Sequence, residues 1–207
     1  MEGSVQRIAA RHLGSAAACA ALVLIPALGA VPVAAHTGSI AGGFAGGFGH
    51  PLFGLDHVAA MVAVGLWGAF LGAPAIFVLP IVFPLVMVFG GVLAIVGVPL
   101  PGTEIAIAVS AVVLGAMVAT AARPPLRVAA AVVGLFAIFH GYAHGAEVPP
   151  GVDAVAYSAG FVVATGLLHL AGIGLGLAAR WPAGRAGVRS AGIAIACAGI
   201  AFLWRLA

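Results

Sequence analysis

The chain has 207 residues, of which 64% are hydrophobic and only 6% carry a formal charge. A soluble domain of ordinary composition has about 25% charged residues, so this composition excludes a water-soluble globular protein and indicates an integral membrane protein. Eight arginines, no lysine and five acidic residues give a net charge of +3, which is too sparse for a nucleic-acid-binding surface. Cys19 and Cys197 lie in separate apolar segments, so neither a disulfide framework nor a thiolate metal site is expected.

Residues 1–35 have the pattern of a secretory signal peptide. Arg7 and Arg11 provide a positively charged start, residues 16–28 form a short apolar core, and residues 33–35 form a small-residue cleavage site. We therefore expect the mature chain to begin after this segment.

Cleavage after Ala35 would make His36 the new N-terminus, where an α-amine and an imidazole can chelate a metal ion together. The alternative is an uncleaved first helix over residues 14–35. Lipid modification at Cys19 has less support, because little apolar sequence precedes it.

Residues 37–49 are rich in glycine and contain Phe44 and Phe48. Glycine is a poor helix former, so no helix is predicted for this segment. The two phenylalanines favour a segment that lies on the membrane interface or dips into it.

Six apolar segments follow, each close to the length of about 20 residues that a helix needs to cross a bilayer. The predicted spans are residues 52–71, 75–97, 103–122, 126–144, 153–178 and 187–205. Pro80 and Pro84 lie inside the second span and predict a kink, which neighbouring helices can accommodate in a membrane. Gly172 and Gly176 permit close helix packing. The sequence therefore predicts an all-α fold, with residues 36–207 forming a single six-helix transmembrane domain.

The arginines predict the orientation of these spans. The loops after the third and fifth spans carry Arg123, Arg127, Arg180, Arg185 and Arg189. By the positive-inside rule these loops lie in the cytoplasm. The opposite side carries Glu104, Glu147 and Asp153, with Arg205 as the exception. We expect a bacterial inner-membrane protein with both mature termini on the periplasmic side, and an uncleaved signal leaves this orientation unchanged.

Two clusters of ionisable residues stand out in this apolar chain. The first is His50-Pro-Leu-Phe-Gly-Leu-Asp56-His57, and the second is Phe139-His140-Gly-Tyr-Ala-His144-Gly-Ala-Glu147. Ionisable side chains at membrane depth are costly and are candidates for function. The predicted orientation places both clusters at the outer ends of their spans, so we expect them to meet.

Spacing within the clusters refines this expectation. His140 and His144 lie on one helical face about a turn apart, and Glu147 continues that face if the helix persists beyond Gly145.

In the first cluster, Pro51 is well placed as the first residue of a helix, which leaves His50 at the cap or just outside it. Asp56 points about 100° away from His57 along a helix. It is either a direct ligand or a group that orients an imidazole from another helix. Met61, four residues after His57, is expected to pack rather than to bind metal.

Imidazoles and carboxylates without a thiolate suit Ni²⁺, Co²⁺ or Zn²⁺ better than Cu(I), and suit Mg²⁺ or Ca²⁺ less well. A transport site must capture an ion and also release it, and the pH dependence of such ligands offers a route to proton coupling. Three further residues are candidates for the path of the ion: His36, Glu104 and His169. Glu104 is otherwise an exposed interfacial acid, and His169 a hydrogen-bonding residue between helices.

The two clusters resemble the two signatures of the HupE/UreJ family of nickel/cobalt permeases, and the resemblance covers essentially the whole chain. The first cluster also resembles the His-x4-Asp-His pattern of the broader nickel–cobalt permeases, with one extra residue. The resemblance implies uptake of Ni²⁺ for hydrogenase or urease, or of Co²⁺ for cobalamin synthesis. It assigns metal handling to His50, Asp56, His57, His140, His144 and Glu147.

The leading hypothesis is therefore a secondary or facilitated importer and not an enzyme, with Ni²⁺ or Co²⁺ as transported substrate and no cofactor. No Gly-x4-Gly-Lys-[Ser/Thr] loop is present to use ATP. The expected partners are the divalent ion and the lipid bilayer, and a homo-oligomer is compatible with the sequence.

Two other classes are left open. One is a membrane-embedded zinc hydrolase built on His140, His144 and Glu147, although the pattern is not His-Glu-x2-His. The other is a non-transporting assembly factor, for which the small loops leave little surface.

Overall fold

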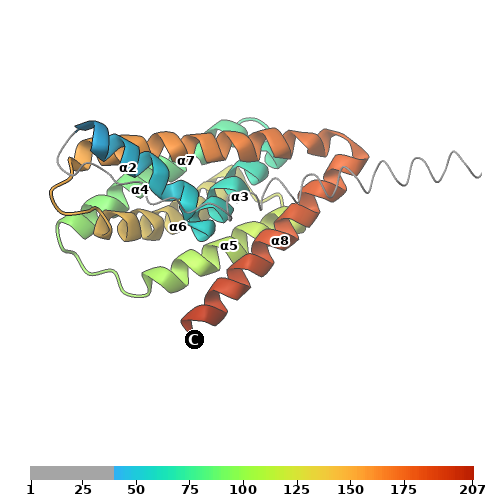
Figure 1. The fold of residues 1–207 in the computed structure, drawn as a ribbon. Coiled ribbons are helices and arrows are strands. Elements are labelled where there is room, and N and C mark those ends of the chain that lie inside the picture. Colours follow the sequence, from blue (N-terminus) through green and yellow to red (C-terminus); the bar gives the residue numbers. More distant parts are fainter. Residues whose placement is uncertain (1–39) are drawn as a thin grey trace, which may run out of the picture.

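The computed structural model describes residues 40–207, and in this part the chain is an all-α bundle (Figure 1). This confirms the predicted fold class. The elements are α2 (Ile40–Phe53), α3 (Leu55–Leu71), α4 (Ala75–Ile95), α5 (Thr103–Ala119), α6 (Leu126–Ala146), α7 (Ala154–Gly176), the short 3₁₀ helix η2 (Leu177–Arg180) and α8 (Pro182–Leu206). The predicted signal segment and His36 lie outside the described residues.

Five of the six predicted spans each coincide with one helix, and the first, residues 52–71, covers the end of α2 and the whole of α3. Four of these, α4, α6, α7 and α8, are each long and apolar enough to cross a membrane. α2 and α3 are bent by 81° against each other and together make a fifth candidate, a broken span or re-entrant loop. α5 has 17 residues, so it is about 26 Å long, slightly less than the hydrocarbon thickness of about 30 Å. The protein is an integral membrane protein.

α2 contradicts the prediction that the glycine-rich segment is not helical. Gly43 and Gly47 face α7, where the two backbones touch: a Cβ at Gly47 would overlap the carbonyl of Tyr157, and a Cβ at Gly160 of α7 would overlap the carbonyl of Phe44. Tertiary packing therefore outweighs the poor helix propensity of glycine.

The prediction that Pro51 begins a helix is also wrong. Pro51 lies in the last turn of α2, and the chain breaks instead at Gly54, the residue before α3. His50 is therefore in the last turn of α2 and not at a helix start. The break also divides the predicted first span, residues 52–71, into two helices.

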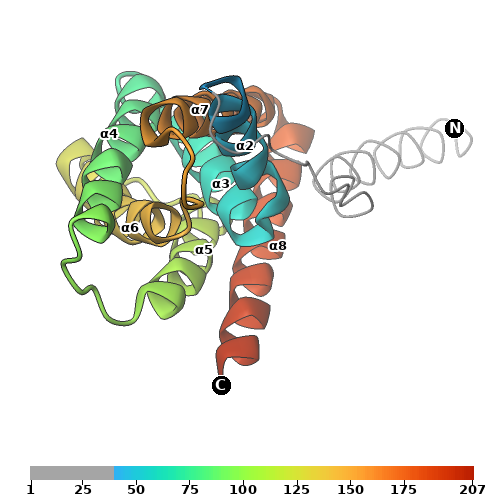
Figure 2. The ribbon, with the colours of Figure 1, turned by 60° about the vertical axis from the view of Figure 1, so that its left-hand side comes forward.

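α3 forms the centre of the bundle (Figure 2). It packs against α4, α5, α7 and α8, and its Met61 and Trp67 are completely buried. The predicted role of Gly172 and Gly176 is confirmed, because both let α7 approach α3 closely: a Cβ at Gly172 would overlap the carbonyl of Val62. α4 pairs with α6, and α5 with α8.

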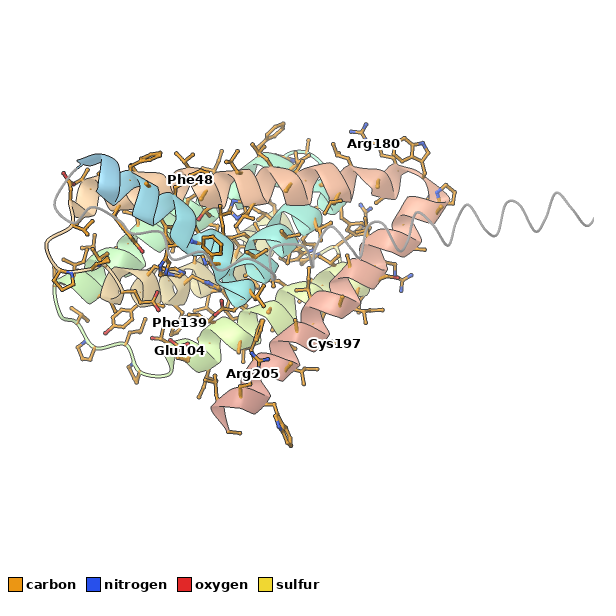
Figure 3. All side chains as sticks on the ribbon, viewed as in Figure 1. Phe48, Glu104, Phe139, Arg180, Cys197 and Arg205 are labelled. Atoms are coloured by element: carbon orange, nitrogen blue, oxygen red, sulfur yellow. The ribbon has the colours of Figure 1, made fainter. Side chains whose placement is uncertain are left out.

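The two ends of the bundle differ in charge. Arg180 lies at one end and Glu104 toward the other (Figure 3). Near the Arg180 end, Arg189 of α8 donates from Nε to the carbonyl of Ala119, the last residue of α5, across 2.8 Å. The antiparallel path of the chain thus gathers the loop arginines at one end.

Candidate metal centre

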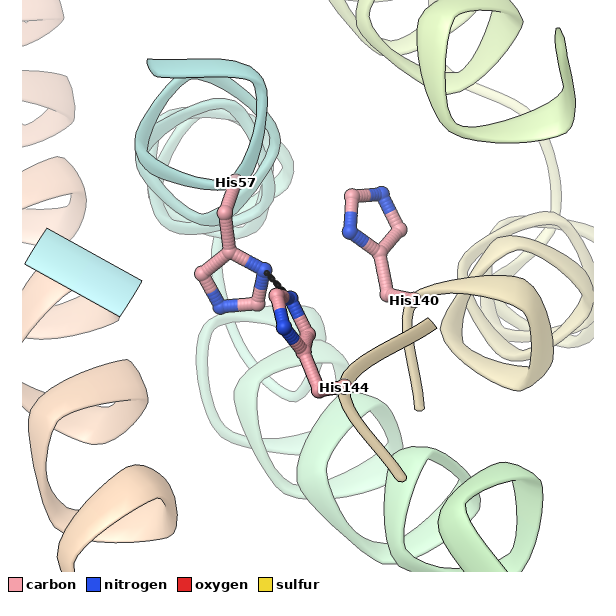
Figure 4. Close-up of side chains that lie close together, drawn as sticks. All are labelled: His57, His140 and His144. Carbon is pink, nitrogen blue, oxygen red and sulfur yellow. Dashed lines mark hydrogen bonds between the residues drawn. The ribbon is translucent and has the colours of Figure 1, made fainter. Parts of the chain in front are cut away.

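Three imidazoles from two helices converge inside the bundle (Figure 4). His57 comes from the first turn of α3, and His140 and His144 lie one turn apart on α6. The Nδ1 atom of His57 and the Nε2 atom of His144 are hydrogen-bonded across 3.0 Å. One nitrogen from each of the three rings lies within 4.8 Å of the others, a spacing that can hold a metal ion. We call this group the histidine triad.

A second possible ligand group lies toward the end of the bundle and shares His144 with the triad. It consists of His50, His144 and Glu147. The Oε2 atom of Glu147 accepts hydrogen bonds from Nε2 of His50 at 2.9 Å and from Nδ1 of His144 at 3.1 Å. We call this group the mouth group. α6 continues through Gly145, and Glu147 follows directly after Ala146 as its C-cap.

The two imidazoles control the charge of Glu147. Hydrogen bonds from His144 and then from His50 lower the pKa of this carboxyl from 4.5 to about 2, although partial burial acts in the opposite direction. Glu147 is therefore a carboxylate at any physiological pH. The C-terminal end of α2, where His50 lies, adds the partial negative charge of a helix dipole. Both features favour a cation at the mouth group.

Hydrogen bonding fixes which nitrogen of His140 can bind a metal. The Ser110 hydroxyl on α5 donates its hydrogen to the carbonyl of Ile107 at 2.6 Å, so toward Nε2 of His140, at 2.9 Å, it can only accept. Nε2 of His140 must then carry the hydrogen, which leaves Nδ1 with a lone pair. Nδ1 is buried and has no hydrogen-bond partner, as expected for an atom that awaits a ligand.

His144 is oriented in a similar way. Its Nδ1 donates to the Glu147 carboxylate, so in the neutral ring Nε2 carries the lone pair and faces His57. A carboxylate bonded to one nitrogen of a histidine is the usual arrangement behind a metal ligand, because it fixes the tautomer and raises the basicity of the other nitrogen. The opposite nitrogen of His57 lies 3.4 Å from the hydroxyl of Thr165 on α7.

A cavity of about 370 Å³ leads to these groups from the end of the bundle where α5 begins and α6 ends. Its lining residues are His50, Phe53, Gly54, Asp56, Glu104, Ile107, His140, Ala143, His144 and Glu147. Asp56 and Glu104 therefore lie on its wall, although neither belongs to the two ligand groups. The Asp56 carboxylate instead accepts the backbone N–H of His57 at 2.8 Å and caps the first turn of α3.

The predicted clusters thus meet, and five of the six predicted metal residues form the two groups. His169 lies on α7 and is 1% exposed, away from both groups.

Ser110 and Thr165 were not predicted as site residues. Their signal in the sequence is a hydroxyl in the middle of an otherwise apolar helix. Met61 is a fully buried core residue.

Fold and site together define a polytopic helical membrane protein with an internal donor set suited to a borderline divalent metal ion. Residues 12–202 match the family described as HupE / UreJ protein. Protein HupE of Rhizobium leguminosarum bv. viciae is 48% identical over 169 residues, which cover 82% of this chain and 88% of that protein. The chain belongs to the HupE/UreJ family, which confirms the resemblance carried by the two clusters. No solved structure matches the chain.

Proposed function

We propose that this protein imports Ni²⁺, with Co²⁺ as a second substrate, across the bacterial inner membrane by secondary or facilitated transport. Membership of the HupE/UreJ family supports this proposal, and so does a ligand set of imidazoles and a carboxylate without a thiolate. The imported ion would supply hydrogenase or urease maturation, or cobalamin synthesis. The chain itself acts as a carrier and not as an enzyme.

The observation that carries the proposal is the sharing of His144 between two adjacent ligand groups. An ion held at the mouth group lies on the Nδ1 side of His144, and the Nε2 side of the same ring faces His57 in the triad, so the ion can be handed from one side of this ring to the other. Exchange of ligands one at a time avoids a bare ion inside the protein. It also meets the requirement that a transport site binds firmly enough to capture and weakly enough to release.

Uptake of radiolabelled Ni²⁺ by cells that lack their own nickel importers tests this function. We expect uptake by the wild type, inhibition by excess Co²⁺ but not by Mg²⁺, and no uptake with His57→Ala or His144→Ala at equal expression. Leu167→Ala, on the outer face of α7 and 50% exposed, is the matched control and should transport normally.

Each contrary result has a distinct meaning. Normal uptake by both histidine variants would exclude the site described here. Absence of uptake by a correctly inserted wild-type protein would exclude transport, and metal-dependent hydrolysis by the purified protein would then be measured.

A further inference from the structure

The fully buried polar side chains of the described part of the chain form one column. They are His57, Ser110, His140, Thr165 and His169. The first four are joined by the hydrogen bonds and ring contacts of the triad. His169 has no part in that network, and its burial among apolar helices has no explanation in the site described so far.

His169 continues the face of α7 that borders the triad. Phe161, Thr165 and His169 follow at intervals of four residues, so they lie on one side of the helix, each about 6 Å further along it. The Phe161 ring lies 4.4 Å from the His144 ring and 5.0 Å from the His57 ring, measured between centroids. The Thr165 hydroxyl faces His57. His169 is therefore the next position of this face, deeper in the bundle.

Both ring nitrogens of His169 are buried without a hydrogen-bond partner. Buried polar atoms in native proteins are nearly always paired, and each exception calls for an explanation such as a functional role or a bound water molecule or ion. A histidine kept only for helix packing would be expected to bond at least one nitrogen to the neighbouring helix. The His169 imidazole lies close to a carbonyl of α4, but neither ring nitrogen makes a regular hydrogen bond.

α4 brings a second unpaired group to the same place. Pro84 has no N–H, so the carbonyl of Pro80, four residues earlier, loses its partner within the helix. That carbonyl lies close to the His169 imidazole, but the pair does not have the geometry of a regular hydrogen bond. An imidazole nitrogen and a free carbonyl oxygen are both acceptable ligands for a borderline divalent cation.

The Phe83 ring lies between this place and the triad. Its centroid is 5.5 Å from that of His140 and also 5.5 Å from that of His169. The side chain of Phe83 is fully buried and contacts both imidazoles.

We propose that His169, with the free carbonyl of Pro80, forms an inner binding station for the same divalent cation, which the ion reaches from the triad past Phe83. This inference rests on the proposed transport function. The inner station receives the ion after the triad and precedes its release, so its loss stops transport without removing the outer ligand groups.

Two measurements on His169→Leu test the station. Leucine has a similar volume and removes both ring nitrogens. We expect Ni²⁺ uptake to fall by about 10–100-fold or more, because loss of a group that only orients a metal ligand already has this effect. Equilibrium binding of Ni²⁺ to the purified protein should remain, because the outer groups are intact. Leu170→Ala, at the exposed neighbouring position, should change neither quantity. Wild-type uptake by His169→Leu would overturn the inner station.

A second experiment detects a metal ligand at position 169 directly. The two natural cysteines are first removed by Cys19→Ala and Cys197→Ala, and His169→Cys is then introduced. Because a thiolate binds Co²⁺ with a charge-transfer absorption band, we expect this band when Co²⁺ is added to His169→Cys. It should be absent from the matched variant Leu170→Cys. Absence of the band from both variants would overturn the proposal. This experiment remains decisive if His169→Leu fails to insert into the membrane. Failure of the wild type to transport would overturn the proposed function instead.

Discussion

Glu147 and His144 are coupled closely enough that each determines the state of the other. The carboxylate orients the His144 ring through Nδ1, and the ring helps to keep the carboxylate ionised. The same oxygen also holds His50. Glu147 therefore acts in two ways, as a ligand at the mouth group and as the group that turns His144 toward the triad.

Glu147→Gln tests this double role. The amide has about the same size but no charge, so it neither attracts the cation nor fixes the His144 tautomer as strongly. We expect the affinity of the purified protein for Ni²⁺ to fall by about 10–100-fold, as measured by equilibrium dialysis. Asp153→Asn is the matched control, because Asp153 caps α7 through Val155 and Ala156 outside the site. An equal loss in both variants would show that only the total negative charge matters.

At the residue scale, the sequence predicted the imidazoles well because ionisable residues in an apolar chain are rare and costly. It predicted less about the residues that orient them. Ser110 and Thr165 carry no charge, and a hydroxyl in a membrane helix is often satisfied by its own backbone. Asp56 was predicted to bind a metal or to orient an imidazole from another helix. Its contact with the backbone N–H of His57 depends on where α3 begins, which local patterns did not reveal.

Glycines at the contacts of α7 determine how closely the helices of the bundle approach. Gly160 and Gly172 both allow α7 to touch a neighbouring backbone, that of α2 and that of α3 respectively. Without water to drive association, close packing of small residues holds membrane helices together. The position of Thr165 beside His57 therefore depends on these two contacts on either side of it.

Gly172→Ala and Gly174→Ala form a matched pair that measures this effect. A Cβ at Gly172 would overlap the carbonyl of Val62, whereas one at Gly174 would meet open space. We expect Gly172→Ala to lower the temperature of thermal unfolding in detergent. Gly174→Ala should leave it unchanged or raise it, because alanine favours a helix over glycine by about 1 kcal/mol. Equal unfolding temperatures for the two variants would contradict the packing role of Gly172.

At the element scale, the hydrophobic segments predicted the last five spans correctly as single helices, because their length and composition are strong signals. The prediction missed α2 because glycine disfavours a helix locally. In the structure, close packing against α7 stabilises this helix. The break at Gly54 was missed for a related reason. Pro51 looked like the obvious boundary, yet a proline in the last turn of a helix disturbs little.

The charges of the whole molecule are separated along the bundle, with Arg180 and Glu104 toward opposite ends (Figure 3). The cavity opens near Glu104 and Glu147. Under the positive-inside rule, this end faces the periplasm. The orientation is a prediction, and the direction of transport depends on it.

Single cysteines in a protein with Cys19→Ala and Cys197→Ala test the orientation. Pro150, between α6 and α7, and Pro125, between α5 and α6, are both exposed and lie at opposite ends of α6. We expect a membrane-impermeant maleimide to label Pro150→Cys in spheroplasts, and Pro125→Cys only after lysis. The reverse pattern would place the cavity in the cytoplasm and favour export.

The cavity also has an electrical consequence. Because it extends from the end of the bundle to His140, an ion at the triad has already left the bulk solution, and the remaining barrier is thinner than the bilayer. The membrane voltage then falls mainly over the rest of the bundle, between the triad and the arginine end. A doubly charged ion that crosses the full voltage gains about 4.6 kcal/mol per 100 mV. In the proposed orientation, a cell interior that is electrically negative supplies this work, so the resting voltage alone can drive accumulation of the metal.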